Sequence, residues 1–138
     1  MSKETTALLH VDEMKTVFKT RSGPLEAVNG VSFHISKGET VAIVGESGSG
    51  KSVSALSVMR LLENSGKVSS GKVLYNDVNL NELSDDEIRK IRGKEIAMIF
   101  QDPMTCLDPV YTIGDQIIEA VKIHEDLSKK EYYERALQ

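Results

Sequence analysis

Hydrophobic and polar residues alternate in the first part of the chain. In residues 31–35 (VSFHI) every second side chain is apolar, a period typical of an antiparallel strand with one buried face. Leu9 and Val11 also alternate with polar neighbours, which predicts another strand there. The loop signals at residues 21–24 and 37–39 should end these elements. The pattern predicts an antiparallel β layer near the N-terminus.

The hydrophobic pattern changes after this layer. Residues 41–44 (VAIV) are an uninterrupted apolar run, as expected of a strand buried on both faces. The Gly- and Ser-rich stretch 45–52 (GESGSGKS) follows it. The apolar side chains of residues 53–62 then spread around a predicted helix, so we expect that helix to be largely buried.

Turn and capping signals divide the second half of the chain. Residues 64–71 should form a polar connection, and Asn76-Asp77 should turn a hairpin between residues 72–75 and 78–80. Ser84 with Glu87, and Ser128 with Glu131, are capping-box pairs that begin helices. The remaining elements expected are a helix end near Gly93, a strand at residues 95–100, a loop at 103–109 and a helix at 113–124.

Composition limits the class of protein. The 138 residues fit one domain, and the net charge of -4 with interspersed basic residues predicts no nucleic-acid binding. The single cysteine, Cys106, excludes an internal disulfide and is expected to be an ordinary loop residue. His10, His34 and His124 are scattered in sequence, so we expect no metal site from them. Without a signal peptide or a spanning segment, a cytoplasmic protein is expected.

The stretch GESGSGKS carries the chemistry. It matches the phosphate-binding pattern GxxxxGK[ST] at Gly45, Gly50, Lys51 and Ser52. Glycines let backbone N–H groups point at phosphate oxygens, the lysine reaches the β and γ phosphates, and the hydroxyl binds Mg²⁺. The helix that follows offers its positive N-terminal end to the same anion. We expect ATP and Mg²⁺ to bind along the whole loop, which comprises Gly45, Glu46, Ser47, Gly48, Ser49, Gly50, Lys51, Ser52 and Val53.

Three stretches together resemble one family. They are AVNGVSFHISKGETVAIVGESGSGKS, SSGKVLYNDVNL and IRGKEIAMIFQDPMTCLDPVYTIGDQIIE. The chain is similar to the N-terminal part of the ATP-binding subunit of ABC transporters, and the third stretch resembles oligopeptide and dipeptide importers in particular. The resemblance implies an α/β fold: a P-loop NTPase core of the ABC ATPase type with an antiparallel β layer (residues 1–100) and the start of a helical subdomain (residues 101–138).

The resemblance also implies residue roles. Gly45, Gly48, Gly50, Lys51 and Ser52 match the Walker A loop. Gln101 matches the Q-loop glutamine, whose side-chain oxygen reaches Mg²⁺ and the attacking water, so Lys51 and Gln101 are the expected catalytic residues and Ser52 and Gln101 the expected metal ligands. Phe18 matches an aromatic residue that stacks on adenine, although it could equally be core packing. Cys106 and Asp108 depart from the Ser and Asn of the peptide-importer pattern.

Partners and completeness also follow from the resemblance. It implies transmembrane permease subunits, a second ATP-binding subunit and, indirectly, an extracytoplasmic peptide-binding protein, with this chain peripheral on the inner face of the membrane. The signature motif, Walker B and the switch histidine are absent from these 138 residues. We therefore expect a truncated chain that binds nucleotide and does not hydrolyse it alone.

Two other classes of function remain open. A small P-loop kinase of a metabolite would have nearly this length, but the antiparallel layer before the loop and the lack of an Arg-rich lid weigh against it. A non-catalytic module that only binds nucleotide or partners is the other alternative.

Overall fold

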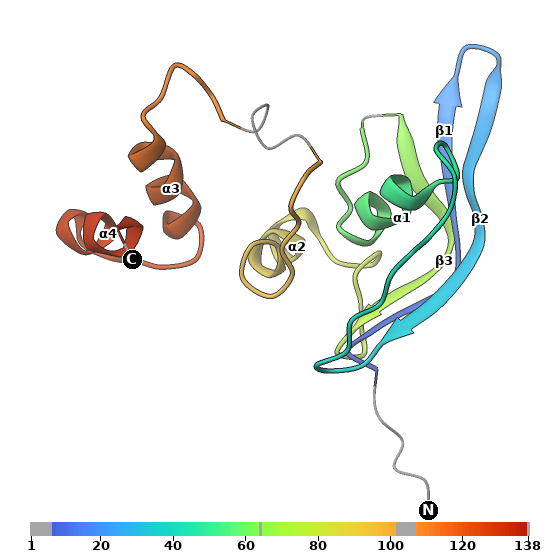
Figure 1. The fold of residues 1–138 in the computed structure, drawn as a ribbon, viewed down its shortest axis with the longest axis horizontal. Helices are drawn as coiled ribbons and strands as arrows, with labels where there is room; N and C mark the ends of the chain where they lie inside the picture. Colours follow the sequence, from blue (N-terminus) through green and yellow to red (C-terminus); the bar gives the residue numbers. More distant parts are fainter. Residues whose placement is uncertain (1–6, 64, 102–106, 138) are drawn as a thin grey trace, which may run out of the picture. The chain divides into compact units, whose positions relative to one another are not determined.

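A computed structural model describes residues 7–63, 65–101 and 107–137 of the chain (Figure 1). The structure divides into two compact units, Met1–Leu83 and Ser84–Gln138, which are described one at a time. The division falls earlier than the boundary predicted between residues 100 and 101, which stays a prediction about family organisation. Residues 102–106, which include Cys106 and most of the predicted loop after Gln101, lie outside the described residues.

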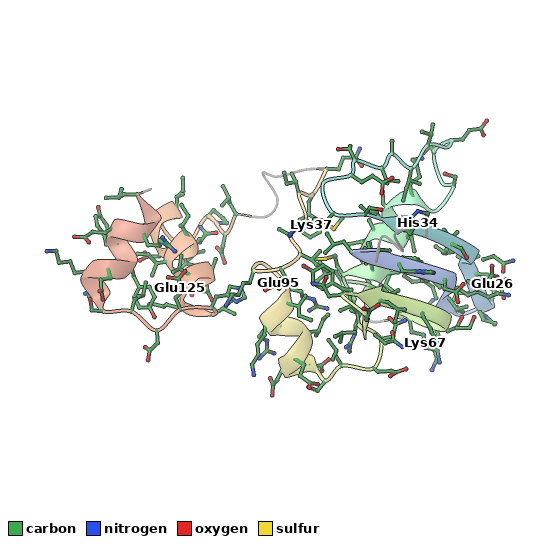
Figure 2. The ribbon with its side chains drawn as sticks, turned by 90° about the horizontal axis from the view of Figure 1, so that it is seen from below. Glu26, His34, Lys37, Lys67, Glu95 and Glu125 are labelled. Carbon is green, nitrogen blue, oxygen red and sulfur yellow. The ribbon has the colours of Figure 1, made fainter. Side chains whose placement is uncertain are left out.

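The first unit is built on a four-stranded antiparallel sheet. Its strands are β1 (Leu9–Thr20), β2 (Gly23–Ile35), β3 (Gly66–Tyr75) and β4 (Val78–Asn79), in the order β2-β1-β3-β4. The two strands predicted from alternation are confirmed, and both are longer than their patterns indicated. Figure 2 shows the charged side chains of Glu26 and Lys67 pointing outward from this unit.

The predicted hairpin is confirmed, but its first strand begins earlier than expected. Asn76 and Asp77 have φ of 46° and 64°, as a two-residue type I′ turn requires. β3 starts at Gly66, inside the stretch predicted to be a polar connection, and pairs with β1 as far as Phe18. Polar composition misled the prediction because pairing with the long β1 supplies hydrogen bonds that local sequence does not report.

The core of this unit lies where helix α1 (Lys51–Val58) contacts β1, β2 and β3 (Figure 1). On β1 the buried positions are Val11, Met14 and Thr16, so the spacing changes from three to two residues. The cause is a bulge at Glu13, a non-glycine residue with φ of 44°, which shifts the strand register. Gly71 permits it, since a Cβ there would lie 2.4 Å from the Glu13 carbonyl oxygen.

The helix after the loop is less buried than predicted. Ser54, Ser57 and Val58 are its buried residues, whereas Val53, Ala55 and Leu56 are partly exposed. Apolar residues around the helix predicted that it would be largely buried, but the described part of the chain covers one face only.

Two further segments predicted as strands, residues 41–44 and 95–100, do not form strands. Residues 41–44 have no strand assignment and Val44 is 90% exposed, while Ile99, in the segment 95–100, is 94% exposed. Within the described residues the second segment has a single isolated bridge, between Arg92 and Ile96. A strand requires a neighbour to satisfy its backbone groups, and an apolar run predicts burial without supplying that neighbour.

The second unit is helical. It contains α2 (Asp85–Ile91), α3 (Ile113–Lys122) and α4 (Lys129–Ala136), which confirms the three predicted helices. α3 and α4 contact each other, and the Lys122 ammonium lies 5.6 Å from the centre of the Tyr132 ring. The Tyr132 hydroxyl donates to the Glu125 carbonyl at 2.8 Å, which fixes the connection between the helices. In the described part of the chain no helix is long and apolar enough to cross a membrane.

Candidate phosphate-binding loop

The loop that precedes α1 turns through two glycines in left-handed conformations. Gly48 has φ of 81°, and Gly50, the N-cap of α1, has φ of 90°. L-residues with a side chain rarely adopt such angles, whereas glycine does so without steric cost. The Ser49 N–H donates to the Glu46 carbonyl at 3.2 Å and closes the turn. The spacing of glycines that predicted a phosphate loop thus forms a tight turn leading into a helix.

Gly50 also fixes the loop against the sheet. A Cβ at this position would lie 2.8 Å from the carbonyl oxygen of Ala27 and 3.6 Å from Cγ2 of Val28. Both residues belong to β2, so the end of the loop and the start of α1 lie close to that strand. A glycine is required here for its conformation and for the close approach of two backbones.

The ammonium group of Lys51 lies over the loop. Its Nζ donates to the carbonyl oxygens of Gly45 at 2.8 Å and Glu46 at 2.6 Å, and it lies 3.4 Å from Ser49 Oγ. The positive charge is therefore held within hydrogen-bond distance of the loop backbone. A lysine ammonium is a compact charge on a flexible stem, able to move from carbonyl oxygens to a phosphate within the same loop.

The N-terminus of α1 differs from those of the other described helices. Ser84, Thr112 and Ser128 each accept a hydrogen bond from a backbone N–H in the first turn of α2, α3 and α4, whereas no side chain caps α1. Backbone pairing in α1 begins with the Ser54 N–H, which donates to the Gly50 carbonyl at 2.8 Å. The N–H groups of the preceding residues have no acceptor within the helix. This donor set and the Lys51 ammonium fit a phosphate group, and the side chain of Ser52, which follows Lys51, is exposed.

The other two predicted site residues lie outside this loop. Phe18 is near the end of β1, opposite Gly66 of β3, and is half-buried. A Cβ on Gly66 would lie 2.6 Å from Cε1 of Phe18, so the ring packs directly on the start of β3. Gln101 belongs to the second unit and is exposed. The structure brings the residues from Gly45 to Val53 together, while the roles of Phe18 and Gln101 stay predictions.

The carboxylates with altered pKa values act locally as hydrogen-bond acceptors. The Ser84 hydroxyl lowers the pKa of Glu87, and the Ser128 hydroxyl lowers that of Glu131, each helped by the backbone N–H of the same serine. The Ser36 N–H, at 2.6 Å, lowers the pKa of Glu39 in the same way. These shifts arise from caps and turns and do not indicate acid–base chemistry.

Sequence reasoning missed two side-chain pairs. His10 and His34, which are far apart in the sequence, are directly opposite each other on β1 and β2. No group of three or more metal-binding side chains occurs among the residues that the structure describes. The second pair is Thr16 with Ser57, buried between β1 and α1. No sequence signal could reveal either pair, because each joins residues far apart in the chain.

Known proteins resemble the chain in sequence and structure. It is 50% identical over 134 residues to the oligopeptide transport ATP-binding protein AppD of Bacillus subtilis, covering 96% of this chain and 41% of that protein. It is 47% identical over 131 residues to the dipeptide transport ATP-binding protein DppD of Escherichia coli strain K12, covering 95% and 40%. The chain thus spans about two fifths of the length of these relatives.

A solved structure of an ATP-binding cassette also resembles the chain. The dimeric post-hydrolysis state of an ATP-binding cassette bound to ADP and Pi matches with a TM-score of 0.75 and 27% identity, over 94% of this chain and 54% of that one. The fold is that of an ABC ATPase cassette, as the sequence predicted. The ABC transporter family profile matches residues 28–138. The chain therefore belongs to the ABC transporter family.

Proposed function

We propose that the chain is the nucleotide-binding part of an ATPase subunit that powers peptide uptake. The observation that carries this proposal is the uncapped N-terminus of α1 with the Lys51 ammonium 2.8 Å and 2.6 Å from two carbonyl oxygens of the preceding loop. Cation and N–H donors at one turn form a site for a polyphosphate. The likeness to proteins named for oligopeptide and dipeptide transport supports the choice of substrate.

The ligand we propose is Mg-ATP. Lys51 would exchange its loop carbonyls for the β and γ phosphates, and Ser52 would bind Mg²⁺ through its hydroxyl. Phe18 would offer a ring face to adenine, and the side-chain amide of Gln101 would reach Mg²⁺ and the attacking water. A bound Mg²⁺ would neutralise charge on the phosphates, a task that Lys51 alone does incompletely.

The partners follow from the same proposal. A subunit of this kind would act at the inner face of the membrane through permease subunits, paired with a second ATP-binding subunit, while a peptide-binding protein delivers the solute outside. Dimeric structures among the similar cassettes support the pairing.

We further propose that these 138 residues bind ATP without sustained turnover. Phosphoryl transfer requires a group that positions the water and others that stabilise the spreading charge. Gln101 has a neutral amide, which can orient a water but cannot take its proton. In a phosphate-release assay the chain should match a Lys51→Ala control, and sustained Lys51-dependent release would favour a self-contained P-loop enzyme.

Calorimetry with Mg-ATP tests the binding proposal. Lys51→Ala removes a charge-assisted contact worth about 1.5 to 3 kcal/mol, so affinity should fall roughly tenfold or more. Lys37→Ala is the matched control, because Lys37 is exposed in the turn before the loop and lies outside the site. Equal affinities in the parent chain and Lys51→Ala would exclude the phosphate-binding role of the loop.

A further inference from the structure

A chain of buried hydroxyl groups joins β1 to the first turn of α1. Thr16 Oγ1 and Ser57 Oγ are 2.8 Å apart, and neither residue is exposed to solvent. Ser57 Oγ also lies 2.6 Å from the Val53 carbonyl oxygen. Figure 1 shows α1 lying beside β1, and this pair makes a polar contact in a core whose other buried residues are mostly apolar.

The direction of these hydrogen bonds follows from counting protons. A hydroxyl has one proton to donate, and the Val53 carbonyl can only accept. The Ser57 hydroxyl must therefore donate to Val53, which leaves its oxygen to accept the proton of Thr16. The resulting chain runs from Thr16 through Ser57 to the carbonyl of Val53, and bonds in such a chain strengthen one another.

The chain ends in the turn that carries the phosphate-facing N–H groups. Val53 is the third residue of α1, so its own N–H is among those without an acceptor in the helix. The Ser54 hydroxyl makes a second contact of this kind, donating to the Gly50 carbonyl at 2.9 Å. Two buried serines thus hold the carbonyls of the first turn, and one of them links that turn to β1.

Packing alone does not account for this arrangement. Apolar residues of similar shape in place of both hydroxyls would be nearly neutral for stability, and a core interface is usually filled that way. Hydrogen bonds are directional, so the hydroxyl pair fixes the rotation and axial position of α1 on the strand more narrowly than methyl contacts would. Thr16 also lies two residues before Phe18 on β1.

We infer that Thr16 is a positioning residue for the phosphate-binding loop. Its hydroxyl acts through Ser57 to align the first turn of α1 with β1, so that the loop N–H groups and Lys51 meet the phosphates in the productive arrangement. The inference rests on the proposed binding of Mg-ATP. Thr16 has no contact with nucleotide in this account; its effect is transmitted by the helix.

Substitutions at Thr16 test the inference in the full 138-residue chain. Thr16→Val removes the hydroxyl and retains the shape, while Thr16→Ser retains the hydroxyl. Mg-ATP affinity should fall about fivefold or more in Thr16→Val, which corresponds to roughly 1 kcal/mol, and should return close to the parent value in Thr16→Ser. Thr20→Val is the matched control, since the Thr20 hydroxyl bonds the Gly23 carbonyl at the turn of the same hairpin.

The urea midpoint of each variant shows whether a loss of Mg-ATP affinity comes from misalignment of α1 or from lower stability of the fold. Ser57→Ala leaves the Thr16 hydroxyl buried without its acceptor and should lower the midpoint, and Thr16→Val combined with Ser57→Ala should recover most of the loss. We expect affinity to remain weak in the double variant although its stability recovers. Affinity that simply follows the midpoint, or Thr16→Val binding within about twofold of the parent, would overturn the inference.

The parent chain distinguishes this failure from failure of the proposed function. Lys51-dependent binding of Mg-ATP with no effect of Thr16→Val would overturn the positioning role alone. A parent chain that does not bind Mg-ATP, or binds it equally well as Lys51→Ala, would overturn both.

Discussion

The start of α1 differs from the starts of α2, α3 and α4 in how the backbone N–H groups of the first turn are bonded. Ser84, Thr112 and Ser128 satisfy first-turn N–H groups with their own hydroxyls, and Glu87 and Glu131 complete two capping boxes. α1 begins at Gly50, which has no side chain to offer. Self-capped ends stabilise the helices that carry them, whereas the end that begins at Gly50 has no side-chain cap, as the proposed binding of a phosphate requires.

The largest effect should come from placing a side chain at Gly50. Gly50→Ala would combine a strained φ of 90° with a contact 2.8 Å from the Ala27 carbonyl, so the loop must move and Mg-ATP affinity should fall more than about tenfold, given roughly 1 to 3 kcal/mol of backbone strain alone. Gly38→Ala is the matched control, since Gly38 has φ of 79° and open space around it. Comparable losses of affinity in both variants would mean that strain, not loop position, controls binding.

Phe18 should produce the next largest effect. If its ring stacks on adenine, Phe18→Ala should weaken ATP by the equivalent of about 1 to 3 kcal/mol and leave inorganic tripolyphosphate unchanged, while Phe18→Tyr keeps both affinities. The ring also packs on Gly66, so the urea midpoint of Phe18→Ala should be measured alongside. A lower midpoint with equal losses for the two ligands would leave Phe18 as a core residue.

Removing a self-capping hydroxyl should affect stability and not binding. Ser84→Ala and Ser128→Ala each lose a cap worth about 1 kcal/mol, so helical circular dichroism and urea midpoints should fall. Calorimetry should give unchanged Mg-ATP affinity, because each cap bonds only donors at the start of its own helix. Weaker Mg-ATP binding in either variant would mean that self-capped helix ends also contribute to binding, contrary to the distinction drawn between them and the uncapped start of α1.

Acidification should produce the smallest effect. The pKa values of Glu87 and Glu131 are lowered in the folded state from an ordinary value of 4.5. Their contribution is therefore complete above that value and is lost as the pH falls through the folded-state pKa. Helical circular dichroism should decline below about pH 4.5, and Glu87→Gln together with Glu131→Gln should reduce the decline. An identical decline in this double variant would assign it to other carboxylates.

The sequence predicted the helices and strands that neighbouring residues specify. It missed the features that depend on contacts between residues distant in the chain. The alternation at Val31–Ile35 and the capping pairs at Ser84 and Ser128 are local, and each corresponds to an observed element. The apolar run at residues 41–44 predicted a strand, but pairing requires a neighbour that these four residues cannot specify.

The candidate site also combines features that neighbouring residues specify with contacts that depend on residues distant in the chain. Glycine spacing and Lys51 located the loop, because loop, lysine and helix are continuous in sequence. The contact of Gly50 with Ala27 and the pairing of Thr16 with Ser57 arise only when β1, β2 and α1 come together. Composition carries no trace of these contacts, since a serine on a helix predicts an exposed residue unless its partner is known.

Backbone amide resonances provide the most direct test of the role assigned to the start of α1. In ¹⁵N-labelled chain titrated with Mg-ATP, we expect large shifts for the amides of Gly48, Gly50, Lys51, Ser52 and Val53. The first-turn amides of α2, α3 and α4, already bonded to Ser84, Thr112 and Ser128, should change little. Unmoved loop amides, or shifts concentrated at the three self-capped helices, would contradict the proposed phosphate-binding role of the loop and the start of α1.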